Sequence, residues 1–156
     1  MHRLVPLSLS LVLLVSSVGT ATAQSSPSPE ELERNKQNVV AYYEMAFNWN
    51  MPAEAVAQYQ GPVYIQHNPL APNGGEAFIA FVSGFKSQFP NARVDIKRVM
   101  AEGDMVVTHS HFKVSPEDRG SAVVDIFRLD ENGKIVEHWD VIQAVPERSL
   151  NDNTMF

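Results

Sequence analysis

The sequence predicts an α+β domain in which N-terminal helices pack on a curved, mostly antiparallel sheet. Two periodicities support this class. Apolar residues recur at helical spacing up to about residue 90, and apolar and polar residues alternate from Arg93 onward. Turn-forming residues separate the alternating segments, and residues 32–156 contain no visible repeat or second domain. Helices followed by an antiparallel meander are typical of a layered α+β arrangement.

The first 23 residues have the pattern of a secretory signal peptide. Arg3 supplies positive charge, residues 4–18 are largely apolar, and small residues precede a cleavage site. Pro6 interrupts the apolar segment, which is also short for a membrane span, so a cleaved signal is favoured over an anchor. We therefore expect cleavage after Ala23, a secreted or periplasmic protein, and no stable membrane insertion after cleavage.

Charge and cysteine content exclude several function classes. The chain has 12 Lys and Arg against 18 Asp and Glu, and loss of Arg3 with the signal peptide gives a net charge of about −7. This balance disfavours nucleic acid or an anionic membrane as a partner. Because the chain has no cysteine, disulfides, Cys-ligated zinc and a thiol nucleophile are excluded.

Residues 24–31 are expected to form a short linker and the start of the first helix. Ser28 is a candidate N-cap, Pro29 suits the first helical position, and Glu31 completes a capping box. The helix should run to about Asn50. Its apolar face consists of Leu32, Val39, Tyr43, Ala46 and Phe47.

Two more helices and a short strand are predicted before the meander. A short helix should span residues 52–59, and "VYIQHNP" at residues 63–69 alternates like a strand that Pro69 ends. A loop then leads to a third helix, which stops at Pro90. We assign its apolar face to core packing rather than to a cofactor, and that face consists of Phe78, Phe81, Val82, Phe85 and Phe89.

The predicted meander has strands near residues 93–101, 105–114, 121–129 and 134–144. The last two form a hairpin about Asn132-Gly133. Centring the turn on these two residues predicts three cross-strand pairs: Arg128 with Glu137, Phe127 with His138, and Asp125 with Asp140. Both faces of the hairpin are mostly apolar, so both are expected to be covered.

The two polar pairs of this hairpin call for different explanations. A cross-strand ion pair explains Arg128 and Glu137. Asp125 and Asp140 oppose each other on the other face, and like charges at that distance resist joint ionisation. A carboxyl group that keeps a proton near neutral pH can act as a general acid or base, with His138 to orient or share that proton. Alternatively, Asp125 bonds backbone amides at a bulge and Asp140 caps the strand end.

The other histidines suggest either a pocket wall or a metal site. Alternation places His109 and His111 on one face of their strand, and a turn at Glu102-Gly103 would put them beside Ile96 and Val94. The two imidazoles could then line the cavity that holds the carboxylates. His-x-His is also a metal-ligand spacing, which His67 or His138 could complete with Asp125. Buried neutral histidines are commoner, so we assign no metal.

Four segments of the sequence resemble a known family. "YIQHNP", "AEGDMVVTHSHF", "VVDIFRLDENGKIVEHWDVIQ" and the terminal "NTMF" resemble the SnoaL-like polyketide cyclase and predicted aldol-condensation family, within the nuclear transport factor two-like superfamily. The resemblance implies a cone-shaped α+β barrel with a pocket between the sheet and the helices. It also implies cofactor-free acid–base catalysis with Asp140 as general acid or base, His138, Asp125 and His111 as pocket partners, and a homodimer formed through the sheet.

Together these observations predict a secreted SnoaL-like enzyme that moves protons on a small apolar carbonyl compound without a cofactor, in an aldol-type cyclisation or an isomerisation. The predicted catalytic residues are Asp140, His138 and Asp125, and the predicted pocket residues are His67, His109, His111, Phe127 and Tyr43. Two alternatives stay open: a non-catalytic small-molecule-binding domain, and a metal-dependent protein that uses His109 and His111. A signal peptide is unexpected on an intracellular cyclase, so the substrate is left open.

Overall fold

The computed structural model describes residues 26–156. The predicted signal peptide and the cleavage after Ala23 therefore lie outside the described residues. Within the described part, no helix is both long and apolar enough to cross a membrane.

The helical layer begins where the capping signal predicts. Helix α1 spans Pro29–Tyr43, Ser28 Oγ accepts from the Glu31 N–H at 3.2 Å, and Glu31 Oε2 accepts from the Ser28 N–H at 2.7 Å. This reciprocal capping confirms the predicted box. The helix then widens into a π-helical turn, η1, over Glu44–Asn48. Helix α2 spans Pro52–Tyr59 and α3 spans Gly75–Gln88.

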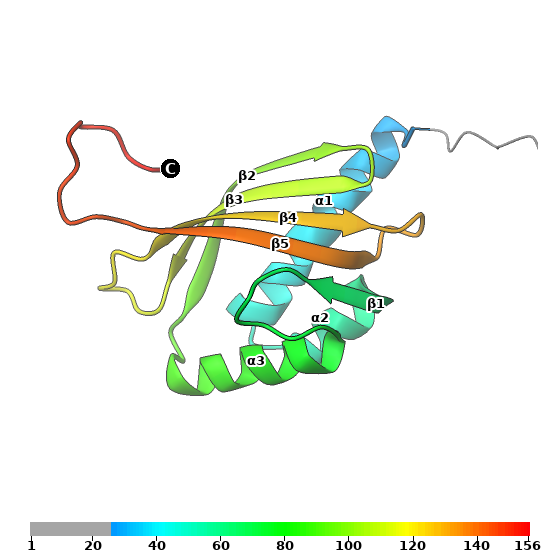
Figure 1. Cartoon of the computed structure of the whole chain (residues 1–156), viewed down its shortest axis with the longest axis horizontal. Helices are drawn as coiled ribbons and strands as arrows, with labels where there is room; N and C mark the ends of the chain where they lie inside the picture. Colours follow the sequence, from blue (N-terminus) through cyan, green and yellow to red (C-terminus); the bar gives the residue numbers. More distant parts are fainter. Residues whose placement is uncertain (1–25) are drawn as a thin grey trace, which may run out of the picture.

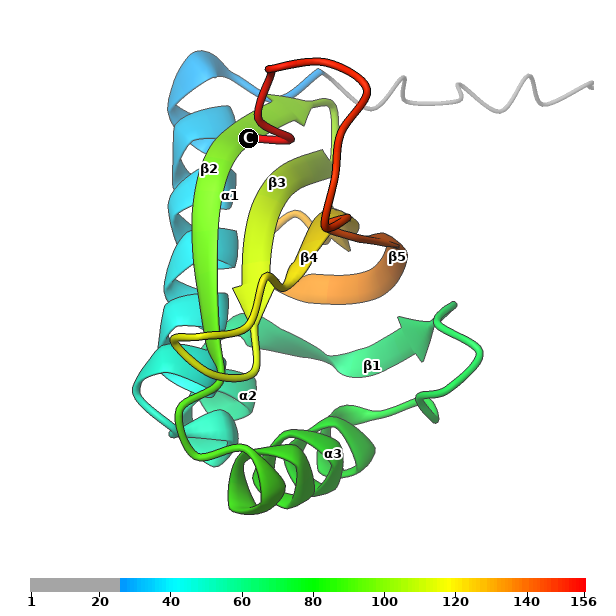
Figure 2. The same ribbon diagram turned by 90° about the vertical axis from the view of Figure 1, so that its left-hand side faces the viewer.

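One five-stranded mixed sheet forms the second layer, in the order β1-β5-β4-β3-β2. Its strands are β1 Gln60–Gln66, β2 Arg93–Glu102, β3 Met105–Lys113, β4 Ser121–Leu129 and β5 Ile135–Ala144. Neighbours pair antiparallel except β1, which runs parallel to β5. Helix α1 packs along β2 and β3, whereas α3 lies near β1 and α2 (Figure 1). The sheet curves strongly, and the helices cover its concave face (Figure 2).

The hydrophobic core fills the space between the helices and this concave face. Its fully buried members come from every layer: Val39, Tyr42, Val82, Val106, Phe127 and Ile135. Burying each such side chain stabilises the fold by about 1.5–3 kcal/mol. Phe78 and Val82 of α3 belong to this core, as predicted.

The register of the β4–β5 hairpin confirms all three predicted pairs, although its turn differs from the expected one. Gly133 adopts a positive φ of 75° and donates to the Asp130 carbonyl at 2.9 Å, while Asp130 donates to the Lys134 carbonyl at 2.8 Å. The loop is therefore one residue longer than a two-residue turn. An irregularity follows, because Leu129 pairs with Ile135 and Val136 is left over before the next pair. The bulge restores the predicted register.

The predicted pairing of β2 with β3 is wrong by one or two residues. The turn is centred on Gly103-Asp104 rather than on Glu102-Gly103, and a register shift lies between Ile96 and Arg98. As a result His109 pairs with Arg98 and His111 with Asp95, not with Ile96 and Val94.

The two faces of the sheet differ in their environment. The concave face carries the buried residues Val123, Asp125 and Phe127, whereas on the convex face Val124 is 37% and Val141 is 68% exposed. The expectation that both faces are covered is therefore wrong for the described chain, because the helices cover one face only.

Candidate active site

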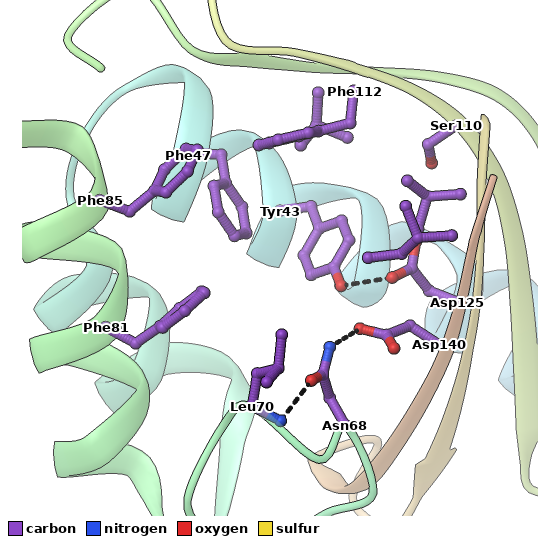
Figure 3. A pocket seen from close by; sticks show the side chains of 13 residues that line it. Tyr43, Phe47, Asn68, Leu70, Phe81, Phe85, Ser110, Phe112, Asp125 and Asp140 are labelled. Carbon is purple, nitrogen blue, oxygen red and sulfur yellow. Dashed lines mark hydrogen bonds between the residues drawn. The ribbon is translucent and has the colours of Figure 1, made fainter. Parts of the chain in front are cut away.

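A cavity of about 260 Å³ lies between the concave face of the sheet, α3 and the loop after β1 (Figure 3). Its polar lining residues gather at one end, where Tyr43, Asn68, Asp125 and Asp140 converge. The rest of the lining, apart from Ser110, is apolar and consists of Phe47, Leu70, Phe81, Phe85, Val94, Phe112, Val123 and Ile142. A cavity with few convergent polar groups in an apolar wall is the usual form of a small-molecule site.

Asp125 forms the buried centre of the polar end. Its side chain is 3% exposed, and its Oδ1 accepts from the Tyr43 hydroxyl at 2.8 Å while Oδ2 accepts from Thr108 Oγ1 at 3.0 Å. His138 Nε2 lies 3.3 Å from the same Oδ1. A buried carboxyl group is stable only where such partners replace water, so these three side chains explain how the sheet accepts Asp125.

Asp140 is directly opposite Asp125 on β5 and is only partly buried. Its Oδ2 accepts from Asn68 Nδ2 at 2.6 Å, and Asn68 Oδ1 in turn accepts from the Leu70 N–H at 2.8 Å. The backbone donor fixes the orientation of the Asn68 amide, so its NH2 group must face Asp140. Asp140 therefore presents a carboxylate to the cavity, with one oxygen held in place (Figure 3).

Tyr43 links α1 to both sides of the polar end. Its hydroxyl lies 2.8 Å from Asp125 Oδ1 and 3.1 Å from His138 Nε2. Burial and the nearby charge of Asp125 raise the pKa of Tyr43 well above its usual value, so the phenol keeps its proton. Tyr43 is the last residue before the π-helical turn, and such turns are frequent at functional sites.

His138 completes the polar end from β5 and is 4% exposed. Its Nδ1 lies 2.9 Å from Gln66 Oε1. Phe127 packs beside it, with ring centroids 4.9 Å apart, and is fully buried. The predicted residues Asp125, His138, Asp140 and Tyr43 thus lie together, and Phe127 supports them from the core rather than lining the cavity.

Comparison with known proteins identifies the family. The family model described as "SnoaL-like domain" matches residues 39–138. The chain belongs to the SnoaL-like domain family. No curated protein matches the sequence.

Solved structures with different described activities share the SnoaL-like fold. A candidate polyketide cyclase from Bacillus cereus ATCC 10987 is 21% identical with a TM-score of 0.63, and the alignment covers 74% of this chain and 78% of that one. A candidate ketosteroid isomerase from Kribbella flavida DSM 17836 is 12% identical with a TM-score of 0.61, covering 81% and 90%. An LEH-like epoxide hydrolase from M. tuberculosis is 19% identical with a TM-score of 0.57, covering 72% and 85%. At these identities the similarity establishes the fold alone.

His67 does not enter the cavity of this SnoaL-like domain, contrary to the prediction. Its ring stacks on Trp139 at 4.5 Å with an interplanar angle of 4°, and its Nε2 lies 2.6 Å from Glu137 Oε1. Glu137 also pairs with Arg128, which confirms the predicted cross-strand ion pair. His67 thus belongs to a polar and aromatic group on the convex face.

His109 and His111 also lie on the convex face, so the prediction that they line the cavity is wrong. His111 Nε2 donates to the Arg119 carbonyl at 2.8 Å, and its ring stacks on that of Phe156 at 4.2 Å. Arg98 Nη1 lies 3.0 Å from His109 Nδ1. Their alternation is as predicted, but the opposite set of β3 residues, Val106, Thr108 and Ser110, faces inward.

The structure does not bring together the predicted metal ligands, because His109 and His111 lie across the sheet from His138 and Asp125. A different set, Asp125, His138 and Asp140, has its ligand atoms within 4.8 Å of one another. The Tyr43 hydroxyl contacts both Asp125 Oδ1 and His138 Nε2 within this set. A cation bound by both atoms would have to displace the phenol.

Sequence reasoning missed Gln66, Asn68, Thr108 and Ser110, as well as the role of Phe81 and Phe85 as cavity walls. The sequence holds only part of the signal for the first two. Alternation places Gln66 and Asn68 on the side of Tyr64 and His67 on the other, but only the structure shows that the Tyr64 side is buried. For His67, His109 and His111 the neighbouring residues reach the site instead of the histidine, whereas His138 is itself part of the site.

Proposed function

We propose that this SnoaL-like domain catalyses cofactor-independent proton transfer on a small carbonyl compound, with Asp140 as the general base. The proposal rests mainly on the different environments of the two facing carboxyl groups, Asp125 and Asp140. Both carboxyl groups line the cavity, but Asp125 is buried and accepts from Tyr43 and Thr108, whereas Asp140 is only partly buried and one of its oxygens is oriented by Asn68. A base must reach the proton it abstracts, and Asp140 has that access.

The proposed step breaks a C–H bond next to the substrate carbonyl. The proton goes to Asp140, and the bonding electrons move into the carbonyl group to give an enolate. The Ser110 hydroxyl is in the lining and can donate to the enolate oxygen, which lowers the energy of the charge that develops there. Return of the proton from Asp140 to another carbon of the delocalised enolate completes an isomerisation. In an aldol-type cyclisation the enolate carbon instead attacks a second carbonyl of the same molecule, and Asp140 returns its proton to the alkoxide that this attack forms.

The lining supports a neutral substrate with an apolar body. Phe47, Phe81, Phe85 and Phe112 form the wall opposite the polar end, and no Lys or Arg is among the lining residues of the described chain. Carboxylates without a basic neighbour repel anionic groups, and an apolar wall excludes the water that would weaken hydrogen bonds to the enolate. The described activities of the cyclase and isomerase relatives are compatible with this class.

We also propose that the protein is exported and that it forms a homodimer. The signal-peptide pattern of residues 1–23 supports a secreted or periplasmic protein that acts on a small metabolite outside the cytoplasm. The uncovered apolar side chains of the convex face, among them Val124 and Val141, support a homodimer formed through the sheet.

Hydrogen–deuterium exchange at carbon tests the proposed chemistry. A panel of neutral cyclic and aromatic ketones is incubated in D2O with the protein, and loss of the α-proton signal is followed by NMR. We expect Asp140→Asn to lower the exchange rate by about 10²–10⁴-fold, the usual contribution of a general base. Asp104→Asn, at an exposed turn position, should leave the rate unchanged. Equal exchange by Asp140→Asn and the unsubstituted protein would refute the assigned base.

The alternative is a non-catalytic binding domain, favoured by the extensive bonding of Asp125 to protein side chains. A ligand that binds the unsubstituted protein and Asp140→Asn alike, with no α-proton exchange by either, would support this alternative.

A further inference from the structure

Gln66, at the end of β1, has an amide group whose orientation is fixed by the backbone. Its Oε1 accepts from the Asn68 N–H at 2.9 Å, and its own N–H donates to Asn73 Oδ1 at 2.8 Å. A backbone N–H can only donate, so the amide atom that faces it must be the oxygen. The loop after β1 therefore determines which amide atom of Gln66 faces His138.

The same oxygen determines the proton position on His138. His138 Nδ1 lies 2.9 Å from Gln66 Oε1. Since that oxygen has no proton to donate, Nδ1 must carry one. In the neutral imidazole, Nε2 then has a free lone pair. This nitrogen faces the Tyr43 hydroxyl at 3.1 Å and Asp125 Oδ1 at 3.3 Å.

We propose that Gln66 is a positioning residue that holds neutral His138 as the Nδ1–H tautomer, so that Nε2 and Asp125 Oδ1 compete for the single proton of Tyr43. This tautomer of His138 is a property of the free protein. Its contribution to catalysis rests on the proposed function.

The arrangement makes the Tyr43 hydroxyl a donor whose direction can change. While His138 is neutral, Tyr43 donates to Asp125 or to His138 Nε2. A proton that arrives at Nε2 converts His138 into a donor to Asp125 Oδ1, and the Tyr43 proton is then free to point to a substrate oxygen in the cavity. Three elements supply the polar and charged groups around this imidazole: Tyr43 from α1, Gln66 from β1, and Asp125 from β4, with Asp140 next to them on β5.

Long-range ¹H–¹⁵N correlation spectra of the ¹⁵N-labelled protein report the tautomer without any substrate. The signals of His138 are assigned by their absence from the His138→Gln spectrum. At a pH where His138 is neutral, we expect a protonated Nδ1 and an unprotonated Nε2. A neutral His138 with its proton on Nε2 in the unsubstituted protein would overturn the proposal.

Variants of Gln66 test whether this residue is the cause. Gln66→Met removes the acceptor at similar size, so the proton should move to Nε2, where Asp125 can accept it. Gln66→Glu keeps an acceptor oxygen at this position, so Nδ1–H should persist. Gln88→Met, on the exposed end of α3, should leave the spectrum of His138 unchanged. An unchanged tautomer in folded Gln66→Met contradicts the proposal.

Failure of Gln66→Met to fold, and either result of the α-proton exchange assay, can also be interpreted. If circular dichroism shows that Gln66→Met does not fold, Gln66→Glu decides, and a neutral His138 with its proton on Nε2 in that variant overturns the proposal. Absence of α-proton exchange by the unsubstituted protein would refute the proposed function but leave the tautomer result intact. If exchange is observed, Gln66→Met should lower kcat with little change in KM, because Gln66 does not line the cavity.

Discussion

Asp125 and Asp140 face each other across β4 and β5, yet hydrogen-bond donors reach them unequally. Tyr43 and Thr108 donate to Asp125, while Asn68 donates to Asp140. Two like charges in register destabilise a sheet unless their surroundings compensate. These unequal surroundings are the basis for proposing Asp140, rather than Asp125, as the general base.

Replacing Asn68 with Leu should impair proton transfer more than binding. The substitution removes the donor that orients Asp140, and a hydrogen bond to a charged group contributes about 1.5–3 kcal/mol. We expect the α-proton exchange rate to fall by about 10-fold or more and ligand affinity to change little. The same assay on Asn91→Leu, an exposed position, provides the control. An exchange rate equal to that of the unsubstituted protein would contradict the assigned role of Asn68.

Removing the Thr108 hydroxyl should destabilise the fold. Thr108 is fully buried and donates to Asp125 Oδ2, so Thr108→Val leaves a buried carboxylate with one donor fewer. The free energy of unfolding should fall by about 1–3 kcal/mol. Thr108→Ser keeps the hydroxyl and should recover much of that loss. Urea denaturation measures both, and equal stability of the Val variant and the unsubstituted protein would refute the prediction.

Truncating Phe85 to Ala should weaken binding of apolar ligands. The ring is part of the cavity wall (Figure 3), and loss of its contact with a ligand is worth about 1.5–3 kcal/mol. The dissociation constant for an apolar fluorescent probe should therefore rise by about 10-fold or more. Phe89→Ala, which removes a ring from the end of the same helix but outside the cavity lining, is the matched control. Equal effects of the two substitutions would contradict this placement of the binding wall.

Stability should decrease at alkaline pH because three tyrosines are buried. Burial raises the pKa of Tyr42, Tyr43 and Tyr64 above the usual value of 10.0. Above about pH 10 the unfolded chain releases these protons while the folded protein retains them, so the free energy of unfolding falls. Each tyrosine contributes about 1.4 kcal/mol per pH unit. Denaturation measured from pH 8 to 11 checks the slope, which Tyr42→Phe should reduce, and a flat profile would contradict the prediction.

Charging the convex face should prevent the proposed homodimer. Val141 is 68% exposed on β5, and a glutamate there would be buried without a partner in an interface formed through the sheet. Sedimentation should detect a dimer of the unsubstituted protein and a monomer of Val141→Glu. Leu150→Glu, in the exposed C-terminal segment, should leave the dimer intact. A monomeric unsubstituted protein at micromolar concentration would refute the proposed dimer.

Local patterns predicted the elements well because each element carries its own signals. The capping box at Ser28 and the alternation from Arg93 onward depend only on neighbouring residues, and the structure contains both. The pairing of Asp125 with Asp140 was also predictable, although the assumed turn was too short. The extra loop residue shifts the pairing of β4 with β5 by one residue, and the bulge at Val136 shifts it back. The predicted pairs are therefore correct only because these two departures from the assumed turn cancel.

The site residues were harder to predict because alternation does not identify which face is covered. His109 and His111 share a face as expected, but α1 packs on the side of Thr108 and Ser110. The same ambiguity applies to His67, because its neighbour Asn68 lines the cavity instead and its neighbour Gln66 contacts His138. The choice between faces is made by tertiary packing, which no short segment encodes.

The parallel pairing of β1 with β5 also affects the order of folding. Gln66 lies beside His138 in this pairing, so the two halves of the polar end are separated by 72 residues of chain. Contacts between such distant segments are expected to form late, because closing the long loop between them costs conformational entropy before the contacts can stabilise the chain. When the chain folds, the helices and the β2–β4 meander can therefore assemble first, and the polar end is complete only when β5 has paired with β1.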